Sequence, residues 1–337
     1  MAEYAVIGAG SWGTALARVL SKNGHDVTVW SIMEDEINML KEKHEHLQKL
    51  PGVKLPESMK FTTDLKEAIE GKDMLVLAVP SIFTRSTSHS MKEYVTDGQL
   101  IVNVAKGIEE DTLMTLTDII KEEVPQARVA VLSGPSHAEE VGKDMPTTLV
   151  AGADTKETAE YVQNAFMCDF IRVYTSPDVL GIELGGALKN VVALAAGMAD
   201  GLGCGDNTKA ALITRGIAEI SRLGIKMGGK PETFAGLTGI GDLIVTCSSK
   251  HSRNRRAGQL IGQGYTYKQA MDEVKMVVEG VYSAKAAVGL SQKYGVSMPI
   301  VEEVNEILFS DKPASDAVKD LMFRDKKTEA QTLKWGE

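Results

Sequence analysis

The chain is poor in cysteine, which argues against a disulfide-rich or zinc-binding protein. It has three cysteines among 337 residues, Cys168, Cys204 and Cys247, and they form no CxxC pair. Cysteines spaced in this way provide neither a disulfide framework nor a zinc site. A reducing compartment therefore fits the sequence best.

An excess of positive charge is also missing. The net charge is −9, and 25% of the residues are charged. This balance argues against broad, charge-driven binding to nucleic acid or to an anionic membrane. His137 and His251 have no partners at metal-ligand spacing, so we expect no metal site.

The sequence shows neither a secretory signal nor a long uncharged apolar run. The N-terminus leads directly into MAEYAVIGAG, with an acid at position 3 and no basic segment. The most apolar region, near residues 184–203, is accompanied by Glu183, Lys189 and Asp200. Charges at these places argue against a membrane span. We therefore expect a cytoplasmic protein without membrane insertion.

The first half of the chain alternates between apolar and helical segments. The apolar segments are continuous, which is typical of strands buried on both faces. The expected strands are residues 3–8, 26–30, 74–80, 100–105, 127–134 and 147–152, and the expected helices include 13–23 and 34–45. Because the spacings are too long for hairpins, they indicate βαβ units in a parallel sheet.

The pattern changes near residue 176. Beyond it, long segments rich in Ala, Leu and Gly have a helical period, and no Pro- or Ser-rich linker separates the halves. A chain of this length is comfortable for two domains. We predict a Rossmann-type α/β domain over residues 1–180 and an all-α domain over residues 181–337. Their boundary, near 180–190, should run directly into a helix.

A glycine motif lies at the start of the predicted α/β domain. The stretch GAGSWGTALA places Gly8, Gly10 and Gly13 as GxGxxG between a strand and a helix. Gly8 permits a tight turn, Gly10 lets the backbone approach a pyrophosphate, and Gly13 allows close packing of helix on strand. The helix N-terminus offers free N–H groups to the phosphates. The motif in this context predicts dinucleotide binding.

The segment that usually distinguishes NAD from NADP carries neither usual residue. An acid at the end of the second strand binds the ribose of NAD, and an arginine nearby accepts the 2′-phosphate of NADP. Here the strand continues into Ser31, Ile32 and Met33, and Glu34 and Asp35 are placed to begin the next helix. The cofactor preference stays open at this position.

Polar groups follow the later strands. Lys106 follows the strand 100–105, and Gly134 and Ser136 follow the strand 127–134. The carboxyl ends of such strands are where α/β folds bind ligands. Asp242 and Thr246 are four residues apart and would share a face if that segment is helical. The alternatives are a surface lysine at 106 and a helix-capping aspartate at 242.

Two further stretches carry charge in unusual places. Lys189 interrupts GGALKNVVALAAG, a stretch otherwise made of small or apolar residues and Asn190. A buried ammonium costs several kcal/mol unless it is compensated, so Lys189 either lies on a solvated face or serves chemistry. The stretch SSKHSRNRRAG gathers cations with Ser and Asn donors, which suits phosphate recognition, a solvated turn being the alternative. Its polar residues are Lys250, Ser252, Arg253, Asn254, Arg255 and Arg256.

Taken together, these stretches resemble the bacterial NAD(P)-dependent glycerol-3-phosphate dehydrogenases over nearly the whole chain. The resemblance is carried, in order, by GAGSWGTALA, VAKGIE, LSGPSHAEEV, GGALKNVVALAAG, TGIGDLIVTC and SRNRRAG. It implies a two-domain fold of the 6-phosphogluconate dehydrogenase type. It also implies reversible reduction of dihydroxyacetone phosphate to glycerol 3-phosphate by hydride transfer from NADH or NADPH, which supplies phospholipid synthesis.

The resemblance implies roles for single residues. Lys189 is the proton donor and acceptor with Asn190 beside it, and Lys106 stabilises the developing alkoxide. Asp242 and Thr246 orient Lys189 and the substrate hydroxyl. The implied substrate contacts are Lys106, Gly134, Ser136, Lys189, Asp242, Ser252, Arg253 and Asn254. The implied cofactor contacts are Gly8, Gly10, Ser11, Trp12, Gly13, Lys106, Ala138, Arg253, Val277 and Glu279.

The chain departs from the family pattern at one place. Many relatives carry a basic residue or His where this chain has Ile32 and Met33, which argues against a strong NADP preference. Lys49 lies where relatives sometimes contact the cofactor. Two alternatives remain: a related dehydrogenase for another hydroxy acid or phosphorylated alcohol, and a non-catalytic NAD-binding regulator. The helical half has apolar surface enough for a homodimer, but oligomeric state, flux direction and feedback inhibition stay open.

Overall fold

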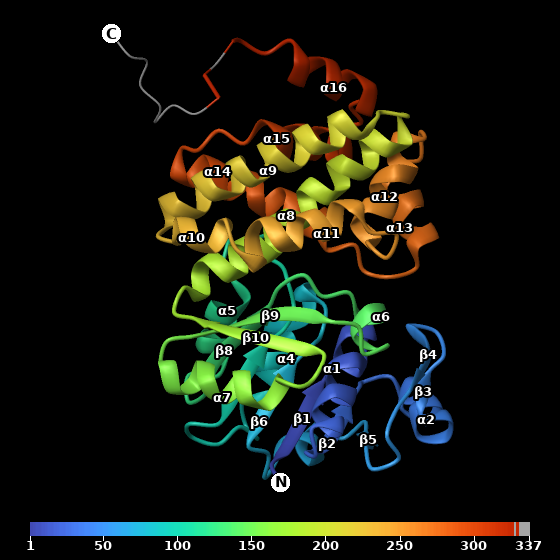
Figure 1. Ribbon diagram of the computed structural model, residues 1–337, viewed down its shortest axis with the longest axis vertical. Coiled ribbons are helices and arrows are strands. Elements are labelled where there is room, and N and C mark those ends of the chain that lie inside the picture. Colours follow the sequence, from blue (N-terminus) through green and yellow to red (C-terminus); the bar gives the residue numbers. More distant parts are fainter. Residues whose placement is uncertain (327, 330–337) are drawn as a thin grey trace.

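An eight-stranded sheet forms the centre of the N-terminal half (Figure 1). The computed structural model describes residues 1–326 and 328–329. The strand order is β10-β9-β8-β7-β6-β1-β2-β5. The strands are β1 (Glu3–Ile7), β2 (Asp26–Trp30), β5 (Lys60–Thr62), β6 (Met74–Leu77), β7 (Leu100–Asn103), β8 (Arg128–Ser133), β9 (Thr147–Ala153) and β10 (Ile171–Ser176). All six predicted strands are present.

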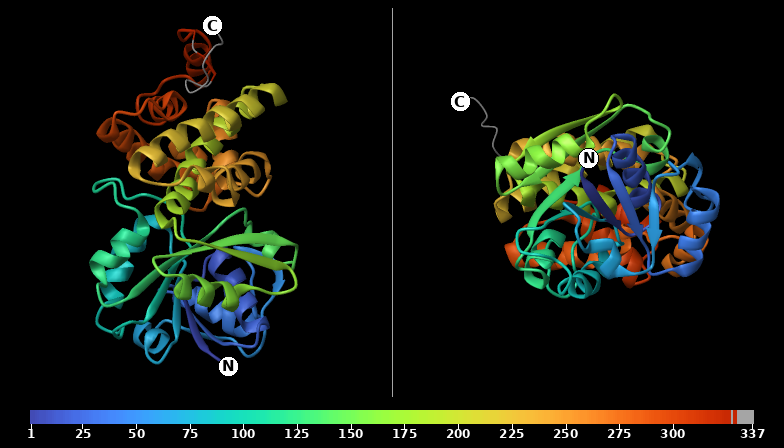
Figure 2. Two further views of the ribbon diagram at one scale, coloured as in Figure 1. Left: turned by 60° about the vertical axis from the view of Figure 1, so that its left-hand side comes forward. Right: turned by 90° about the horizontal axis from the view of Figure 1, so that it is seen from below.

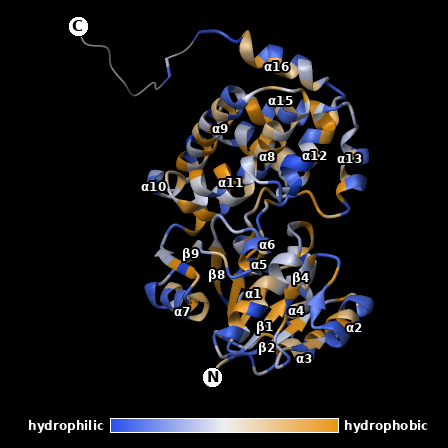
Figure 3. Ribbon diagram, turned by 45° about the vertical axis from the view of Figure 1, so that its right-hand side comes forward, coloured by the Kyte–Doolittle hydropathy of each residue, from blue (hydrophilic) through white to orange (hydrophobic). Residues whose placement is uncertain are grey.

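Helices cover both faces of this sheet. They are α1 (Ser11–Lys22), α2 (Glu34–Lys43), α3 (Leu65–Ile69), the short η1 (Ser81–Phe83), α4 (Thr84–Met91), α5 (Leu116–Glu123), α6 (Ala138–Val141) and α7 (Lys156–Phe166). The central strands β6 and β7 are buried at every position, and hydrophobic residues make up most of the central strands in Figure 3. This explains why continuous apolar runs marked the strands better than alternation would.

The predicted all-parallel sheet is wrong at one edge. β8 pairs with β9 in antiparallel register, Leu132 opposite Ala151, whereas β9 and β10 run parallel to each other. The connection 134–146 contains only the four-residue helix α6, which packs on α1 and does not cross the sheet. A parallel neighbour would need a full crossover, so β9 returns in the opposite direction. β10, β5 and the small hairpin β3 (Glu45–His46) and β4 (Leu50–Lys54) were not predicted.

The C-terminal half is helical. It lies next to the sheet domain along the long axis of the molecule, above it in Figure 1 and in the left view of Figure 2. Its helices are α8 (Val179–Gly201), α9 (Asp206–Met227), α10 (Pro231–Phe234), the π-turn η2 (Leu237–Gly241), α11 (Asp242–Ser248), α12 (Arg253–Gly262), α13 (Tyr267–Val274), α14 (Glu279–Tyr294), α15 (Pro299–Phe309) and α16 (Ala314–Met322). The prediction of a Rossmann-type domain followed by a helical domain is confirmed. The predicted second domain also includes residues 327 and 330–337, which lie outside the described residues.

Helix α8 is the core of the helical half. Every residue from Gly181 to Ala199 is buried, and α9, α11, α12, α14 and α15 pack around it. By length and composition alone α8 could cross a membrane, but 83% of its most apolar window is buried inside the protein. The helix begins at Val179, so the proposed division after residue 180 falls in its first turn.

Helices α8 and α12 lie unusually close because glycines face each other. A methyl group on Gly197 would lie 2.0 Å from the Arg255 carbonyl oxygen, and one on Gly258 would lie 2.1 Å from that of Leu194. Gly201 and Gly262 continue the contact one turn further on. The two backbones therefore touch directly and run parallel, which fixes the position of α12 relative to α8.

Candidate active site

The predicted site residues come from elements that meet where the sheet faces the helical half. Lys106 follows β7, and Gly134 follows β8. Lys189 lies in the middle of α8, and Asp242 begins α11. The carboxyl ends of two sheet strands thus face the buried core helix, which is where α/β folds place ligands.

Lys189 is buried and paired. Its side chain is 6% exposed, and its Nζ lies 3.0 Å from Asp242 Oδ1. It also donates to Thr246 Oγ1 at 2.6 Å. The alternative that Lys189 lies on a solvated face is therefore wrong, because every α8 residue from Gly181 to Ala199 is buried.

A second lysine binds the same carboxylate. Lys106 Nζ donates to Asp242 Oδ2 at 2.7 Å and to the Gly134 carbonyl at 2.9 Å. Asp242 therefore bridges two ammonium groups, one from each half of the molecule. The alternative of a free surface lysine at 106 is excluded by these contacts.

Lys189, Lys106 and Asp242 lie close enough that their charges alter the pKa values of Lys189 and Asp242. Burial lowers the pKa of Lys189 to about 8; Lys106 adds to this effect and Asp242 opposes it. Burial would raise the pKa of Asp242, but Lys106 and Lys189 outweigh it and hold that pKa below its usual value. Lys189 can therefore exchange a proton near neutral pH, while Asp242 stays ionised.

Thr246 follows Asp242 by one helical turn on α11, which confirms the predicted shared face. Its hydroxyl accepts from Lys189 and donates to the Asp242 backbone carbonyl at 2.6 Å. The hydroxyl is thereby oriented with its lone pair toward the ammonium. The spacing of four residues thus positions both polar groups on Lys189.

The basic stretch 250–256 divides in the structure. Ser252 caps α12 by accepting from the Arg255 N–H at 3.2 Å. Arg255 itself pairs with Asp200 on α8 at 2.6 Å. Lys250 and Arg256 are exposed and line a surface cavity of about 300 Å³ with Arg255. Arg253 is half-buried at the start of α12, and it neither pairs with Asp200 nor lines that cavity.

Asn190 and Asn254 bind each other rather than standing free. Asn254 Nδ2 donates to Asn190 Oδ1 at 2.9 Å, and Asn254 Oδ1 accepts from the Gly280 N–H at 2.8 Å. This chain of amides joins α8, α12 and the start of α14. One N–H of Asn254 remains for a phosphate oxygen.

The glycine motif forms a cradle of the predicted kind. Gly8 has φ +118°, and a methyl group there would lie 2.8 Å from the Ala78 carbonyl carbon. One on Gly13 would lie 2.0 Å from the Gly8 carbonyl oxygen, whereas Gly10 faces open space and precedes α1 without a side-chain cap. The residues fit a dinucleotide pyrophosphate, because bare backbone amides at a helix N-terminus remain accessible.

The other predicted cofactor contacts surround this cradle. Ser11 and Trp12 open α1, Ala138 opens α6, and Val277 lies two residues before the start of α14. Glu279 is half-buried, accepts from the Ser81 N–H at 3.1 Å and also accepts from the Ser81 hydroxyl. Sequence reasoning missed Ser81. It could have been found, because it follows β6, the strand that pairs with β1 and its glycine turn.

The end of β2 is held by a carboxylate that was also missed. Glu36 accepts from Ser31 Oγ at 2.5 Å and pairs with Lys49 Nζ at 2.5 Å and with His46 Nε2 at 2.8 Å. Burial opposes ionisation, yet these three partners lower the pKa of Glu36 to about 2. Ile32 and Met33 are 78% and 58% exposed. A cation, Lys49, therefore does lie at this end of the site, supplied from beyond α2.

Two titratable groups near the site, the half-buried His137 and the buried Glu183, were not given a role from sequence. Burial, aided by Lys189 and Lys106, lowers the pKa of His137 to about 4. Burial raises the pKa of Glu183 to about 7, although it accepts from the Thr117 N–H at 3.0 Å. Burial also raises the pKa of Cys247 to about 12, so that thiol stays protonated near neutral pH.

No metal centre was predicted, and within residues 1–326 and 328–329 no cluster of three or more His, Cys, Asp or Glu has a metal-binding arrangement. The three cysteines are free thiols. The polar atoms that converge on one point are instead those of two lysines, an aspartate and a threonine. This arrangement is suited to moving a proton and stabilising a developing oxyanion.

Comparison with known proteins matches both halves of the chain. Residues 3–159 match the family described as NAD-dependent glycerol-3-phosphate dehydrogenase N-terminus, and residues 178–319 match its C-terminus. A glycerol-3-phosphate dehydrogenase [NAD(P)+] of Agathobacter rectalis is 68% identical, covering 99% of this chain and 100% of the relative. The same enzyme of Fusobacterium nucleatum is 61% identical, covering 98% and 100%.

A solved structure shows the same fold. The glycerol-3-phosphate dehydrogenase of Coxiella burnetii superimposes with a TM-score of 0.93 at 36% identity, covering 96% of this chain and 99% of that one. The family matches and the structural match both extend over the two halves of the chain. The chain therefore belongs to the NAD-dependent glycerol-3-phosphate dehydrogenase family.

Proposed function

We propose that the chain catalyses the reversible reduction of dihydroxyacetone phosphate to glycerol 3-phosphate with NADH or NADPH. The observation that carries this proposal is the buried pair of lysines on one aspartate, beside a dinucleotide cradle. A carbonyl group between the two ammonium groups would have a proton donor and a charge-stabilising partner. The product is a precursor for phospholipid synthesis.

Lys189 is the proposed acid and base. As the ammonium it gives a proton to the substrate oxygen as that oxygen becomes an alkoxide. In the reverse direction the neutral amine accepts the proton of the C2 hydroxyl. Its pKa of about 8 leaves both forms accessible near neutrality.

The partners of Lys189 have separate tasks. Lys106 lies on the same carboxylate and stabilises the negative charge that develops on the substrate oxygen. Asp242 holds both ammonium groups, and Thr246 fixes the direction of the Lys189 N–H bonds. Asn190 holds the first turn of α12 against α8 through Asn254.

We propose that the substrate phosphate binds at the start of α12. Arg253, the free N–H of Asn254 and the Ser252 end of the helix would hold it. Gly134 and Ser136 line the opposite side, where the Ser136 hydroxyl donates to the Gly134 carbonyl at 2.9 Å. The three carbons would then lie between Lys189 and Arg253.

The cofactor would lie along the glycine cradle with its pyrophosphate at the N-terminus of α1. When bound, its nicotinamide supplies the hydride, while the protein supplies position and electrostatics. The proposed contacts are Gly8, Gly10, Ser11, Trp12, Gly13, Lys106, Ala138, Arg253, Val277 and Glu279. Lys49 is the proposed cation near a 2′-phosphate; because Glu36 competes for it, we propose no strong preference for NADP.

Other finer assignments are proposals as well. We propose a cytoplasmic enzyme, a division into domains 1–180 and 181–337, and a homodimer formed through the helical half. Lysines, an aspartate and a threonine account for the proton chemistry, so no metal role is proposed. No binding to nucleic acid and no membrane insertion is proposed.

Steady-state turnover tests the function directly. We expect oxidation of NADH and of NADPH with dihydroxyacetone phosphate, and a loss of roughly a thousandfold in kcat/KM with unphosphorylated dihydroxyacetone, because remote phosphate binding positions the reacting carbon. Equal rates with both ketones would favour a related dehydrogenase for an unphosphorylated substrate. Cofactor binding without turnover of either would favour a non-catalytic regulator.

A further inference from the structure

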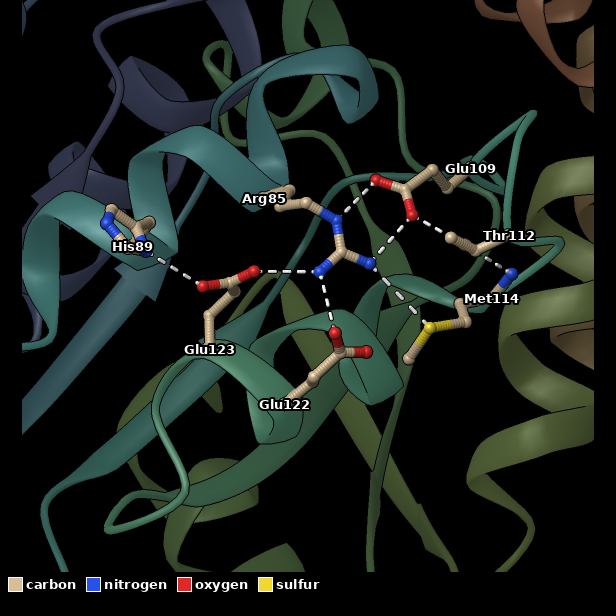
Figure 4. Close-up of polar contacts among 7 residues, drawn as sticks. All are labelled: Arg85, His89, Glu109, Thr112, Met114, Glu122 and Glu123. Carbon is tan, nitrogen blue, oxygen red and sulfur yellow. Dashed lines mark hydrogen bonds and ion pairs between the residues drawn. The ribbon is translucent and has the colours of Figure 1, made fainter.

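The loop of residues 107–115, which follows Lys106, is held by a cluster of charges outside the active site (Figure 4). Arg85, on α4, binds Glu109 of this loop through two bonds of 2.8 Å, from Nε to Oε1 and from Nη2 to Oε2. Its remaining nitrogen reaches Glu123 at 2.7 Å and Glu122 at 3.1 Å, both at the end of α5. One guanidinium therefore joins α4, the loop and α5.

The positive charge of Arg85 compensates three neighbouring carboxylates, those of Glu109, Glu122 and Glu123. Glu122 and Glu123 end α5, where the helix dipole is already unfavourable to negative charge. His89 contacts Glu123 at 3.0 Å but does not reach Glu109. Without Arg85, repulsion from the end of α5 would push the carboxylate of Glu109, and the loop that carries it, away.

The loop continues directly from Lys106. A methyl group on Gly107 would lie 2.4 Å from the Ser81 Cβ, so the backbone after Lys106 packs tightly on η1. On the other side, the Ala105 backbone N–H donates to the Asn103 side-chain Oδ1 at 3.1 Å. The Lys106 backbone therefore lies between the Asn103 contact and the start of the loop, so a displacement of the loop would reach Lys106 through Gly107. Arg85 lies on the same segment as Ser81, four residues further along.

We propose that Arg85 is a positioning residue for Lys106: through Glu109 it fixes the loop 107–115 and so sets where the Lys106 ammonium lies relative to Asp242. The assignment rests on the proposed function, since it gives Arg85 a task in that reaction. Arg85 itself touches neither the reacting groups nor the cradle.

The pH dependence of turnover separates positioning from mere structural support. The charged or titratable groups that face Lys189 are Asp242 and Cys247 from α11, Lys106 from the segment between β7 and the loop, and His137 from the segment before α6. Cys247, with a pKa of about 12, and His137, with a pKa of about 4, do not titrate in the working range. If Lys106 moves away, its repulsion of Lys189 is lost, and the pKa of Lys189 rises.

The experiment measures kcat for glycerol 3-phosphate oxidation from about pH 6 to pH 10, where neutral Lys189 is required. For Arg85→Gln and Glu109→Gln we expect the midpoint of the rise in kcat to move upward by about half a pH unit or more. We also expect kcat/KM for dihydroxyacetone phosphate to fall roughly tenfold, with the KM for NADH changed less than about threefold.

Glu122→Gln is the matched control. It removes a carboxylate from the same guanidinium, but one that lies on α5 and not on the loop, so its midpoint should equal that of the wild type. If Arg85→Gln does not fold, as thermal unfolding would show, Glu109→Gln decides alone. Unmoved midpoints in the loop variants, or an equal shift in Glu122→Gln, would overturn the proposal. A wild type without turnover would instead overturn the proposed function itself.

Discussion

Helix α8 carries one buried carboxylate, Glu183, and contacts a second, Asp242 of α11, and the two behave in opposite ways. Asp242 meets α8 at Lys189 and binds two ammonium groups, and its pKa is held below the usual value. Glu183, six residues before Lys189, binds the Thr117 N–H and the Asn103 amide, and its pKa is raised to about 7. Both groups are almost fully buried.

The difference between these two centres lies in their partners. Burial penalises the charged form of either acid, and neutral donors offset only part of that penalty. Two cations offset all of it at Asp242. At the Asp242 centre the same burial lowers the pKa of Lys189, so proton exchange near neutrality arises there, whereas the Glu183 centre joins β7, α5 and α8. Four substitutions would break or sharpen this contrast.

Lys189→Met should have the largest effect. It removes the proposed proton donor, so we expect kcat to fall by about 10³ to 10⁴ while NADH binding is retained. Single-turnover kinetics and cofactor titration measure the two separately. Lys209→Met is the matched control, because Lys209 also pairs with a carboxylate, Asp200, at 2.8 Å; a similar loss there would contradict a catalytic role for Lys189.

Asp242→Asn should come next. It leaves two ammonium groups facing each other without a countercharge, so the pKa of Lys189 should fall below about 8. We expect kcat to fall by about 10² and the free energy of unfolding by about 3 kcal/mol, since a buried pair loses one partner. The pH profile of kcat and urea unfolding measure these. An alkaline shift of the profile would show that the carboxylate does not set the charge balance.

Thr246→Val should have a smaller effect on catalysis. It keeps the shape of the side chain but removes the hydroxyl that binds Lys189 at 2.6 Å. One hydrogen bond of this kind corresponds to about a three- to tenfold loss in kcat. Thr117→Val is the counterpart at Glu183, because it removes the hydroxyl that donates to that carboxylate, and it should reduce stability without reducing kcat. Equal kinetic losses in both variants would remove the distinction between the two centres.

Glu183→Gln should affect turnover least. We expect kcat to stay within about threefold of the wild type, with a change in the pH dependence of stability instead. The folded pKa of about 7 lies above the ordinary glutamate pKa of 4.5, so the wild type is most stable below about pH 4.5 and loses stability as the pH rises to about 7. The variant should lack this loss, which amounts to about 3 kcal/mol for a shift of this size. Urea unfolding at pH 5 and pH 8 measures it; parallel pH dependence in both proteins would contradict the shifted pKa.

Sequence patterns predicted the fold where one physical cause dominated. Strands buried on both faces, such as β6 and β7, require continuous apolar runs, and these were found. β10 was missed because only its alternate residues are buried, as on an exposed edge. The direction of β9 was missed because it depends on where α6 packs, and a four-residue helix leaves no periodic signal.

The candidate site was predictable to the extent that its residues sit in distinctive local patterns. Lys189 was recognisable because a cation in an apolar helix has to be explained. Ser81 and Glu36 were missed because neither is unusual in its own stretch. They matter through partners 198 and 13 residues away, and only the folded chain brings those together.

The glycine contact between α8 and α12 also bears on substrate size. Asn190 and Asn254 are hydrogen-bonded neighbours, and each directly follows a proposed ligand group, Lys189 and Arg253. Because the two backbones are in direct contact, no side chain between them can rearrange to change their separation. The two helices therefore fix the distance between the Lys189 ammonium and the Arg253 guanidinium. Under the proposed roles, the number of carbons between carbonyl and phosphate is selected by this fixed length, and a methyl group on any of the four glycines would alter it.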